Sequence, residues 1–136
     1  MNNHFQISLK NVTKNFKGLD VPVLKNLSFN INSSEKVAIL GSSGSGKSTL
    51  LHIIAGLDSP SEGNLLFNNL DMRSISDNKM ATLRNQHIGF VYQSHHLLND
   101  FSSIENVMMP LTVRRGDYLK DFNQAKKVLK KLVLIW

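Results

Sequence analysis

Apolar residues occupy every second position in two stretches near the start of the chain, over 5–9 and 27–31. Because successive side chains of a strand point to opposite faces, this alternation predicts two half-buried strands. A continuous apolar run at 37–40 favours a strand over 36–40 that is buried on both faces. Residues 63–67, which precede an Asn-Asn turn, and the β-favouring run at 88–92 predict two further strands.

Helices are predicted between and after these strands. Residues 49–55 and 76–86 have the composition and the flanking turn residues of helices. Ser102 and Glu105 have the spacing of a capping box, so a helix should begin there, and Pro110 should kink or end it. Since strands and helices alternate from residue 36 onward, the pattern favours an α/β domain with a parallel sheet.

The end of the chain has the pattern of an amphipathic helix. From Asp121 onward, lysines separate apolar residues that repeat at helical spacing, namely Phe122, Ala125, Val128, Leu129, Leu132 and Trp136. Residues 114–136 contain seven basic and two acidic residues, so they carry +5 of the chain's net charge of +6. Such a segment is either a solvated helix face or a surface for nucleic acid or an anionic membrane.

Length and composition exclude several classes of protein. At 136 residues, the chain is expected to form one domain. It has no cysteine, which excludes disulfides and cysteine-based zinc sites. It has no apolar run of the roughly 20 residues that a membrane span needs, and its first residues lack the pattern of a secretory leader. A cytoplasmic location is therefore expected.

The strongest chemical signal is the glycine-rich segment 41–48, which fits the pattern Gly-x-x-x-x-Gly-Lys-Ser/Thr with an additional glycine at position 44. Glycines allow backbone N–H groups to approach phosphate oxygens closely, and the following helix directs its positive end at them. The ammonium of Lys47 would reach the β- and γ-phosphates, and the hydroxyl of Ser48 would bind Mg²⁺.

This match is specific. Average residue usage makes a chance occurrence in a chain of this length about 1 in 200. The segment also lies between a predicted buried strand and a predicted helix, as phosphate binding requires. The alternative is a flexible Gly/Ser linker that happens to contain a lysine, but linkers rarely separate two apolar elements.

Several separated segments resemble the ATP-binding domain of ABC transporters. Residues 36–51 resemble its Walker A region, 54–63 the continuation, 23–29 its antiparallel β-subdomain and 89–93 its Q-loop. The segments that carry the resemblance include Val23-Leu24-Lys25-Asn26-Leu27-Ser28-Phe29, Ile54-Ala55-Gly56-Leu57-Asp58 and Gly89-Phe90-Val91-Tyr92-Gln93. The resemblance implies the N-terminal part of a P-loop nucleotide-binding domain of the α/β class. We expect a mainly antiparallel β-subdomain over about 1–35, a P-loop core with an incomplete parallel sheet over about 36–93, and the start of the helical subdomain over about 94–136.

The segment after Gln93 is similar to one subgroup, the ATP-binding subunit of the lipoprotein-releasing (Lol) system of Gram-negative inner membranes. The similarity rests on Ser94-His95-His96-Leu97-Leu98-Asn99-Asp100-Phe101, Glu105-Asn106-Val107 and Met109-Pro110-Leu111. Relatives in macrolide export and cell division share the Glu-Asn-Val and Pro-Leu segments and usually lack the paired histidines. The subgroup interpretation therefore depends on His95 and His96.

The resemblance also implies roles for single residues. Phe16 aligns with the aromatic residue that stacks on adenine, where the family more often has tyrosine. Ser48 and Gln93 would complete the Mg²⁺ shell with water. The region after Gln93 would face the membrane permease subunits, and a second ATP-binding subunit is implied. The residues that would cradle the phosphates of ATP are Gly41, Ser42, Ser43, Gly44, Ser45, Gly46, Lys47, Ser48 and Thr49.

Each of these roles has a structural alternative. Phe16 could be a core residue, and Gln93 a surface loop residue. The pair His95-His96 could suggest a metal, but adjacent loop histidines without further ligands rarely bind one ion. The resemblance implies a peripheral location at the cytoplasmic face of the inner membrane and no nucleic-acid partner.

Three elements of the family pattern are absent from the 136 residues: a Leu-Ser-Gly-Gly-Gln-like signature, an apolar strand ending in Asp-Glu, and a later switch histidine. Phosphoryl transfer to water needs an oriented nucleophile, so we expect negligible ATP hydrolysis by this chain alone. In the family, strands from the absent part separate the strand at 36–40 from that at 88–92. We therefore expect a gap in the core sheet and marginal stability.

Four functions remain open from the sequence. The first is an ABC-type ATP-binding subunit for lipoprotein release, with macrolide export or cell division as related systems. The second is a non-catalytic, truncated remnant of such a subunit. The third is a P-loop kinase or GTPase, although the guanine-specific Asn-Lys-x-Asp is absent. The fourth is a basic nucleic-acid-binding module, which only the charge supports.

Overall fold

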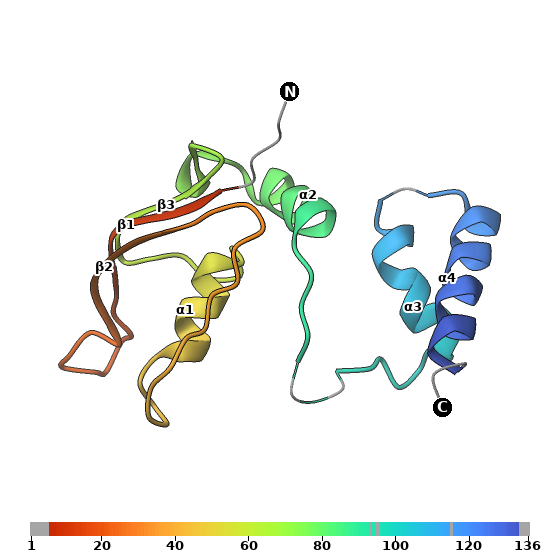
Figure 1. The fold of residues 1–136 in the computed structure, drawn as a ribbon, viewed down its shortest axis with the longest axis horizontal. Helices are drawn as coiled ribbons and strands as arrows, with labels where there is room; N and C mark the ends of the chain where they lie inside the picture. The colour runs from red at the N-terminus through yellow and green to blue at the C-terminus, as the bar shows by residue number, and fades with distance from the viewer. Residues whose placement is uncertain (1–5, 93, 95, 115, 134–136) are drawn as a thin grey trace. The chain divides into compact units, whose positions relative to one another are not determined.

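A computed structural model describes residues 6–92, 94, 96–114 and 116–133. The chain divides into two compact units, Met1–Arg84 and Asn85–Trp136, whose elements Figure 1 shows. The predicted roles of Gln93 and His95 and the helical position of Trp136 lie outside the described residues. Each unit is described by itself below.

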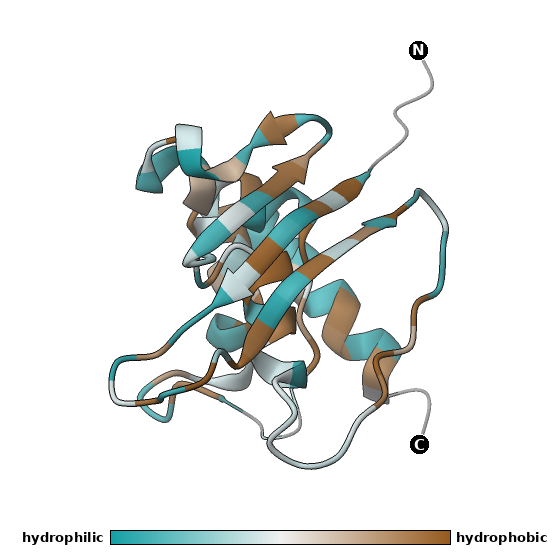
Figure 2. Ribbon diagram, turned by 90° about the vertical axis from the view of Figure 1, so that its left-hand side faces the viewer, coloured by the Kyte–Doolittle hydropathy of each residue, from teal (hydrophilic) through white to brown (hydrophobic). Residues whose placement is uncertain are grey.

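The first unit is built on a four-stranded antiparallel sheet with the strand order β2-β1-β3-β4. Its strands are β1 (Ile7–Lys14), β2 (Leu24–Ile31), β3 (Glu62–Phe67) and β4 (Leu70–Asp71). Ile7 pairs with Ile31 on one side and with Phe67 on the other. In Figure 2, hydrophobic and hydrophilic residues alternate along these strands. The strands predicted from this alternation and at 63–67 are confirmed.

Two irregularities shape the sheet. The register of β1 shifts on both sides near Asn11, which has a φ of 51°. The backbone of Gly63 passes so close that a Cβ there would lie 2.3 Å from the carbonyl oxygen of Asn11. Asn68 and Asn69 both have positive φ, as a tight turn between two antiparallel strands requires. The irregularity near Asn11 and the turn after β3 therefore depend on glycine and asparagine, because these residues tolerate a positive φ.

The core of the first unit lies between the sheet and helix α1 (Lys47–Ile54), which runs along one side of the strands in Figure 1. Leu9, Val12, Leu65 and Ile53 are its largest fully buried side chains. The predicted helix at 49–55 therefore exists and begins two residues earlier. After β4 come a 3₁₀ turn (Met72–Ser74) and helix α2 (Asp77–His87), which confirms the helix predicted at 76–86.

The strands predicted at 36–40 and 88–92 are wrong for this structure, because both segments lie outside any strand. The side chain of Leu40 is 91% exposed and that of Val91 is fully exposed. A β-favouring sequence becomes a strand only where a neighbouring strand takes up its backbone hydrogen bonds. The described residues provide no such neighbour here, so the expected parallel core sheet does not form in this structure.

The second unit contains helices α3 (Ser103–Thr112) and α4 (Tyr118–Val133), which pack on each other. The capping box is confirmed: the hydroxyl of Ser102 accepts from the N–H of Glu105, and the Glu105 carboxylate accepts from the N–H of Ser102 at 2.8 Å. Pro110 ends α3 less abruptly than predicted, since the helix continues to Thr112. The carbonyl of Pro110 accepts a hydrogen bond from the Asn85 side chain at 2.9 Å.

Helix α4 begins three residues before the predicted start at Asp121. The Asp117 carboxylate accepts from the N–H of Leu119 at 3.0 Å and thereby caps the first turn. Ala125 is fully buried against the rest of the unit, as its place on the apolar face predicts. Within the described residues, none of the helices combines the length and apolar character that a membrane crossing demands.

Candidate functional site

The glycine-rich loop connects residue 41 to the first turn of α1. Gly44 and Gly46 have φ of 78° and 86°, and the N–H of Ser45 donates to the carbonyl of Ser42 at 3.3 Å. Gly46 is the N-cap of α1, and no side chain caps this helix end. The N–H groups of the first helical turn therefore remain available to an anion, and the helix dipole favours negative charge there.

At two glycines of the loop an added Cβ would meet neighbouring atoms. A Cβ on Gly46 would lie 2.9 Å from the carbonyl oxygen of Val23 and 2.9 Å from the side chain of Leu24. A Cβ on Gly41 would lie 2.5 Å from the hydroxyl oxygen of Ser45. The loop is therefore folded tightly on itself and rests on the start of β2.

The ammonium of Lys47 is held within the loop. Its Nζ donates to the carbonyl of Gly41 at 2.9 Å and to that of Ser42 at 2.5 Å, and it lies 3.4 Å from the hydroxyl of Ser45. Lys47 is thus the first residue of a helix and at the same time reaches back over the preceding turn. This places a positive charge beside the uncapped N-terminus of α1.

A cavity of about 370 Å³ lies against the loop. It is lined by Val23, Ser43, Gly44, Ser45, Gly46, Lys47, Ser48 and Thr49. These eight residues supply hydroxyl groups and one cation and no carboxylate, so the cavity is electrostatically suited to an anion. The structure brings together seven of the predicted phosphate-binding residues on this cavity and places Gly41 and Ser42 as the carbonyl partners of Lys47.

The predicted Mg²⁺ ligands are only partly described. Ser48 lines the cavity next to Lys47, whereas Gln93 lies outside the described residues. Among the residues that the structure describes, no group of three or more His, Asp or Glu side chains could hold a metal. The donor set nevertheless fits Mg²⁺, which keeps several waters and is bound through substrate phosphates plus one or two protein oxygens.

Phe16 lies in the loop between β1 and β2 and is 41% exposed, so it is not a core residue. The Nζ of Lys14 lies 5.0 Å from the centroid of its ring, within the range of a cation–π contact. The N–H of Val23 donates to the carbonyl of Lys14 at 2.9 Å, which closes this loop at its base. Since Val23 lines the cavity, the loop that carries Phe16 starts and ends beside the glycine-rich loop.

Lys14 also forms an ion pair with Asp58, with 2.6 Å between Nζ and Oδ1. Burial raises the pKa of Asp58, but the hydrogen bonds from Lys14 and from the N–H of Ser59, together with the charge of Lys14, outweigh it and hold the pKa below its ordinary value. Sequence reasoning missed both Lys14 and the cavity contact of Val23. No local pattern marks them, because their partners are distant in the sequence.

The segment after residue 93 is partly described. His96 Nε2 lies 3.1 Å from the hydroxyl of Ser94, and its ring meets that of Tyr92 edge-on with 4.7 Å between centroids. The ring of Tyr92 in turn stacks on Phe90. One of the paired histidines therefore belongs to an aromatic cluster.

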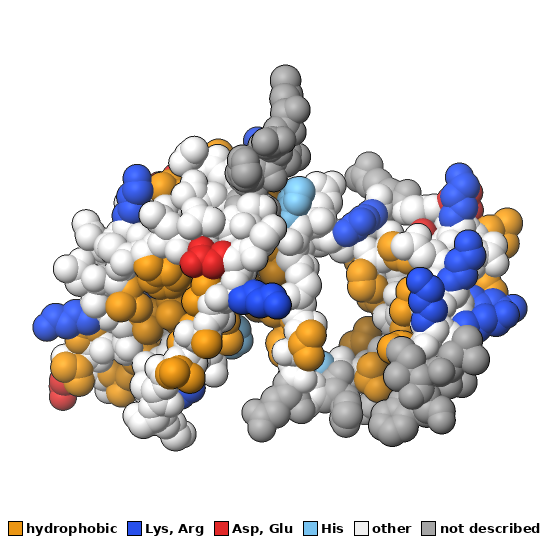
Figure 3. Space-filling view, in the orientation of Figure 1, with side chains coloured by type: hydrophobic (Ala, Val, Ile, Leu, Met, Phe, Trp, Pro, Cys, Tyr) orange, Lys and Arg blue, Asp and Glu red, His pale blue; other side chains and the backbone are white. Residues whose placement is uncertain are grey.

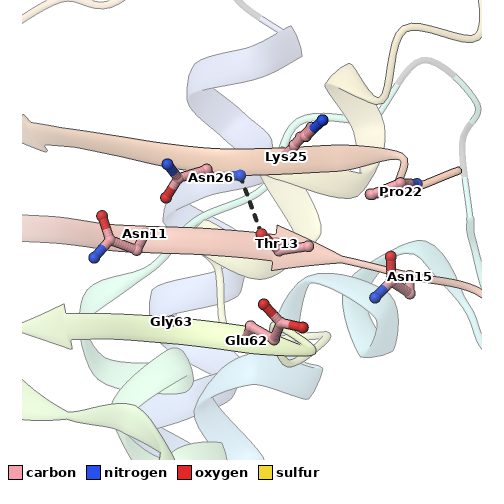
Figure 4. Close-up of a pocket in the computed structure, with 8 residues that line it drawn as sticks. All are labelled: Asn11, Thr13, Asn15, Pro22, Lys25, Asn26, Glu62 and Gly63. Atoms are coloured by element: carbon pink, nitrogen blue, oxygen red, sulfur yellow. Dashed lines mark hydrogen bonds between the residues drawn. The ribbon is translucent and has the colours of Figure 1, made fainter.

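A second, larger hollow of about 620 Å³ lies over the strands of the sheet. Figure 4 shows its lining residues on three strands and the loop between β1 and β2, with the N–H of Asn26 donating to the hydroxyl of Thr13 at 3.0 Å. The lining residues are Asn11, Thr13, Asn15, Pro22, Lys25, Asn26, Glu62 and Gly63. This hollow coincides with the shifts in strand register, and sequence reasoning assigned it no role.

Comparison with known proteins places these features in a family. The model of the ABC transporter family matches residues 24–135. A dimeric structure of MJ0796, described as a bacterial ABC transporter cassette, is 40% identical with a TM-score of 0.82. A dimeric post-hydrolysis structure of the ATP-binding cassette MJ0796 bound to ADP and Pi is 39% identical with a TM-score of 0.81. Both comparisons cover 91% of this chain and 56% of the other chain.

A bacterial Atm1-family ABC exporter with ATP bound is more distant, at 29% identity and a TM-score of 0.65, over 79% of this chain and 18% of that chain. The chain thus spans little more than half the length of the cassettes that it matches. The family model nevertheless covers most of its residues, and the predicted fold class, part of an ABC-type P-loop nucleotide-binding domain, is confirmed, although the parallel strands expected within it do not form in this structure. The chain belongs to the ABC transporter family and has, over the part that it spans, the fold of the P-loop nucleotide-binding domain.

Proposed function

We propose that this chain is the ATP-binding component of an ABC transporter and that it binds Mg²⁺-ATP at the glycine-rich loop. One observation carries the proposal: the Lys47 ammonium lies beside an uncapped helix N-terminus, on a cavity without a carboxylate. Phosphate oxygens satisfy all three features at once, since they accept from the ammonium, from the free N–H groups and from hydroxyls.

Single residues take the following roles in this proposal. Gly41 to Thr49 bind the phosphates, and Ser48 and Gln93 hold Mg²⁺ together with water. When bound, the metal ion neutralises charge on the phosphates. Phe16 stacks on the adenine. Its exposure and its place on a loop anchored next to the cavity support this role.

The contacts of the whole protein follow from the family. We propose a β-subdomain over about 1–35, a P-loop core over about 36–93 and the start of the helical subdomain over about 94–136. We also propose that a second ATP-binding subunit is a partner and that membrane permease subunits contact the region after Gln93. Dimeric structures of MJ0796 support the second subunit. An apolar hollow of about 170 Å³ in the second unit supports a protein partner there. Its lining residues are Phe101, Glu105, Met108, Met109, Thr112 and Tyr118.

The transported substrate is proposed on sequence resemblance. The paired histidines at 95 and 96 favour release of lipoproteins from the inner membrane toward the outer membrane, with the chain at the cytoplasmic face. Macrolide export and cell division are the related alternatives.

Nucleotide binding is tested by titrating the chain with a fluorescent ATP analogue in the presence of Mg²⁺. Lys47→Ala should abolish saturable binding. Lys36→Ala removes the same charge from an exposed position outside the cavity and should leave the affinity unchanged. Equal binding by the Lys47→Ala variant and the native chain would refute the proposed site.

The choice among transporters is tested by co-purification. The chain should be retained by permease subunits of a lipoprotein-releasing system and not by those of a macrolide exporter. Retention by the macrolide exporter alone would overturn the assignment to lipoprotein release and leave ATP binding untouched.

A further inference from the structure

We propose that one face of α4 binds the anionic headgroups of a phospholipid bilayer. This face, here called the lysine face, consists of Lys120, Lys126, Lys127, Lys130 and Lys131, all of which are exposed. The proposal goes beyond nucleotide binding and uses only the second unit of the chain.

The spacing of these lysines aligns them along the helix. Lys120, Lys127 and Lys131 follow one another at intervals of seven and four residues, which places them on one stripe of an α-helix. Lys126 and Lys130 form the neighbouring stripe. At 1.5 Å per residue, the array is roughly 17 Å long, and at 100° per residue it covers a sector of roughly 140°. In Figure 3, basic side chains gather over α4.

Little negative charge offsets this array. Lys120 pairs with Asp117 at 3.5 Å between Nζ and Oδ2, and for the other four lysines the described part of the chain places no carboxylate within ion-pair distance. The one acidic residue within α4, Asp121, is only 8% exposed and therefore turns away from solvent. Helix α4 therefore presents five exposed lysines, and its one aspartate is buried.

Exposed apolar side chains border the lysines. Leu119 is 69% exposed and shares the stripe of Lys126 and Lys130, and Val128 and Leu132 are 42% and 55% exposed on the other flank. A helix that combines a lysine-rich face with exposed apolar groups is suited to a membrane interface, where lysines meet headgroups and apolar groups enter the acyl boundary.

The same features favour a membrane over nucleic acid. Apolar flanking residues gain little from a phosphate backbone in water. The helix also contains no arginine, the residue that binds phosphates and base edges in a bidentate manner. Lysines act as point charges, and the diffuse negative potential of an anionic bilayer attracts each of them separately. The membership in a transporter family places a bilayer within reach.

The test measures co-sedimentation of the chain with vesicles of equal parts phosphatidylglycerol and phosphatidylcholine, and with vesicles of phosphatidylcholine alone. The chain should bind the anionic vesicles, and binding should weaken steeply with salt. Each lysine contributes about five-fold to the partition coefficient, so the combined change Lys120→Gln, Lys127→Gln and Lys131→Gln should reduce it by roughly 100-fold.

The matched control removes the same charge elsewhere. Lys10→Gln, Lys17→Gln and Lys25→Gln change three exposed lysines of the first unit and should reduce the partition coefficient only weakly. A separate change, Leu119→Ser, should lower the binding that persists at high salt. Circular dichroism establishes that each variant keeps its helices.

Three results would overturn the proposal. The first is equal binding to neutral and anionic vesicles. The second is an equal loss in the control variant, which would show a general effect of net charge. The third is binding to duplex DNA that depends on the lysine face, with no binding to anionic vesicles. ATP binding is measured on the same samples, so vesicle binding without ATP binding would refute only the proposed function.

Discussion

The change Gly46→Ala should lower the stability of the first unit more than a glycine-to-alanine change at any other position of the glycine-rich loop. Its φ of 86° is a left-handed conformation, which costs an L-residue about 1–2 kcal/mol. The added Cβ would also meet the carbonyl oxygen of Val23 and the side chain of Leu24, each at 2.9 Å. Overpacking of this kind adds about 1–3 kcal/mol, because backbone must move to relieve it.

Gly44→Ala is the matched comparison. Gly44 has a similar φ of 78°, but a Cβ there would meet no atom within 4 Å. This variant should therefore show only the conformational cost of about 1–2 kcal/mol, lessened slightly because alanine also restricts the unfolded chain. The difference between the two variants isolates the packing of the loop on β2.

Urea unfolding followed by far-ultraviolet circular dichroism measures both variants. The free energy of unfolding should fall by about 2–5 kcal/mol for Gly46→Ala, a large fraction of the stability of an ordinary domain. The nucleotide affinity of the variant reports whether the cavity shifts as well. If Gly44→Ala and Gly46→Ala lose the same free energy, the contact argument is refuted and only the dihedral angles matter.

Two further predictions concern contacts outside the loop. Because the pKa of Asp58 is held below its ordinary value, its ionised form stabilises the fold above the ordinary aspartate range, and this contribution is lost as pH falls through the lowered pKa. Lys14→Met should lower the free energy of unfolding at neutral pH by about 1–2 kcal/mol. The free energy of unfolding of this variant should also decline less as the pH falls. If it declines in acid as steeply as that of the native chain, this pairing is refuted. Asn106→Ala removes four hydrogen bonds to the backbone of residues 98–102. Hydrogen exchange at the amide of Leu98 should accelerate, because that N–H donates to the Asn106 side chain, whereas the Asn106→Asp variant, which keeps this acceptor, should retain most of the protection.

Local patterns predicted much of the secondary structure. The alternation at 27–31, the turn after residue 67 and the capping box at Ser102 each depend on residues close in sequence, and the structure confirms them. The predicted start of α4 was three residues late, because the cap at Asp117 was overlooked. The glycine-rich loop was also predictable, since its spacing expresses a local backbone requirement.

Contacts between distant segments could not be predicted. The pairing of Lys14 with Asp58 joins residues 44 positions apart. The support that Val23 gives to Gly46 likewise depends on how β2 meets the loop. The strands predicted at 36–40 and 88–92 were wrong, because a strand also needs a distant neighbour to take up its backbone hydrogen bonds.

The sequence by itself therefore determined the local features of the proposed phosphate site: a glycine-rich loop, a lysine at its end and a helix that begins there. Only the tertiary structure decided which surfaces surround that loop, which charges are paired and which predicted strands form. The physical reason is that dihedral preferences, caps and turns act between near neighbours, whereas strand pairing, burial and ion pairs need partners that the fold brings together.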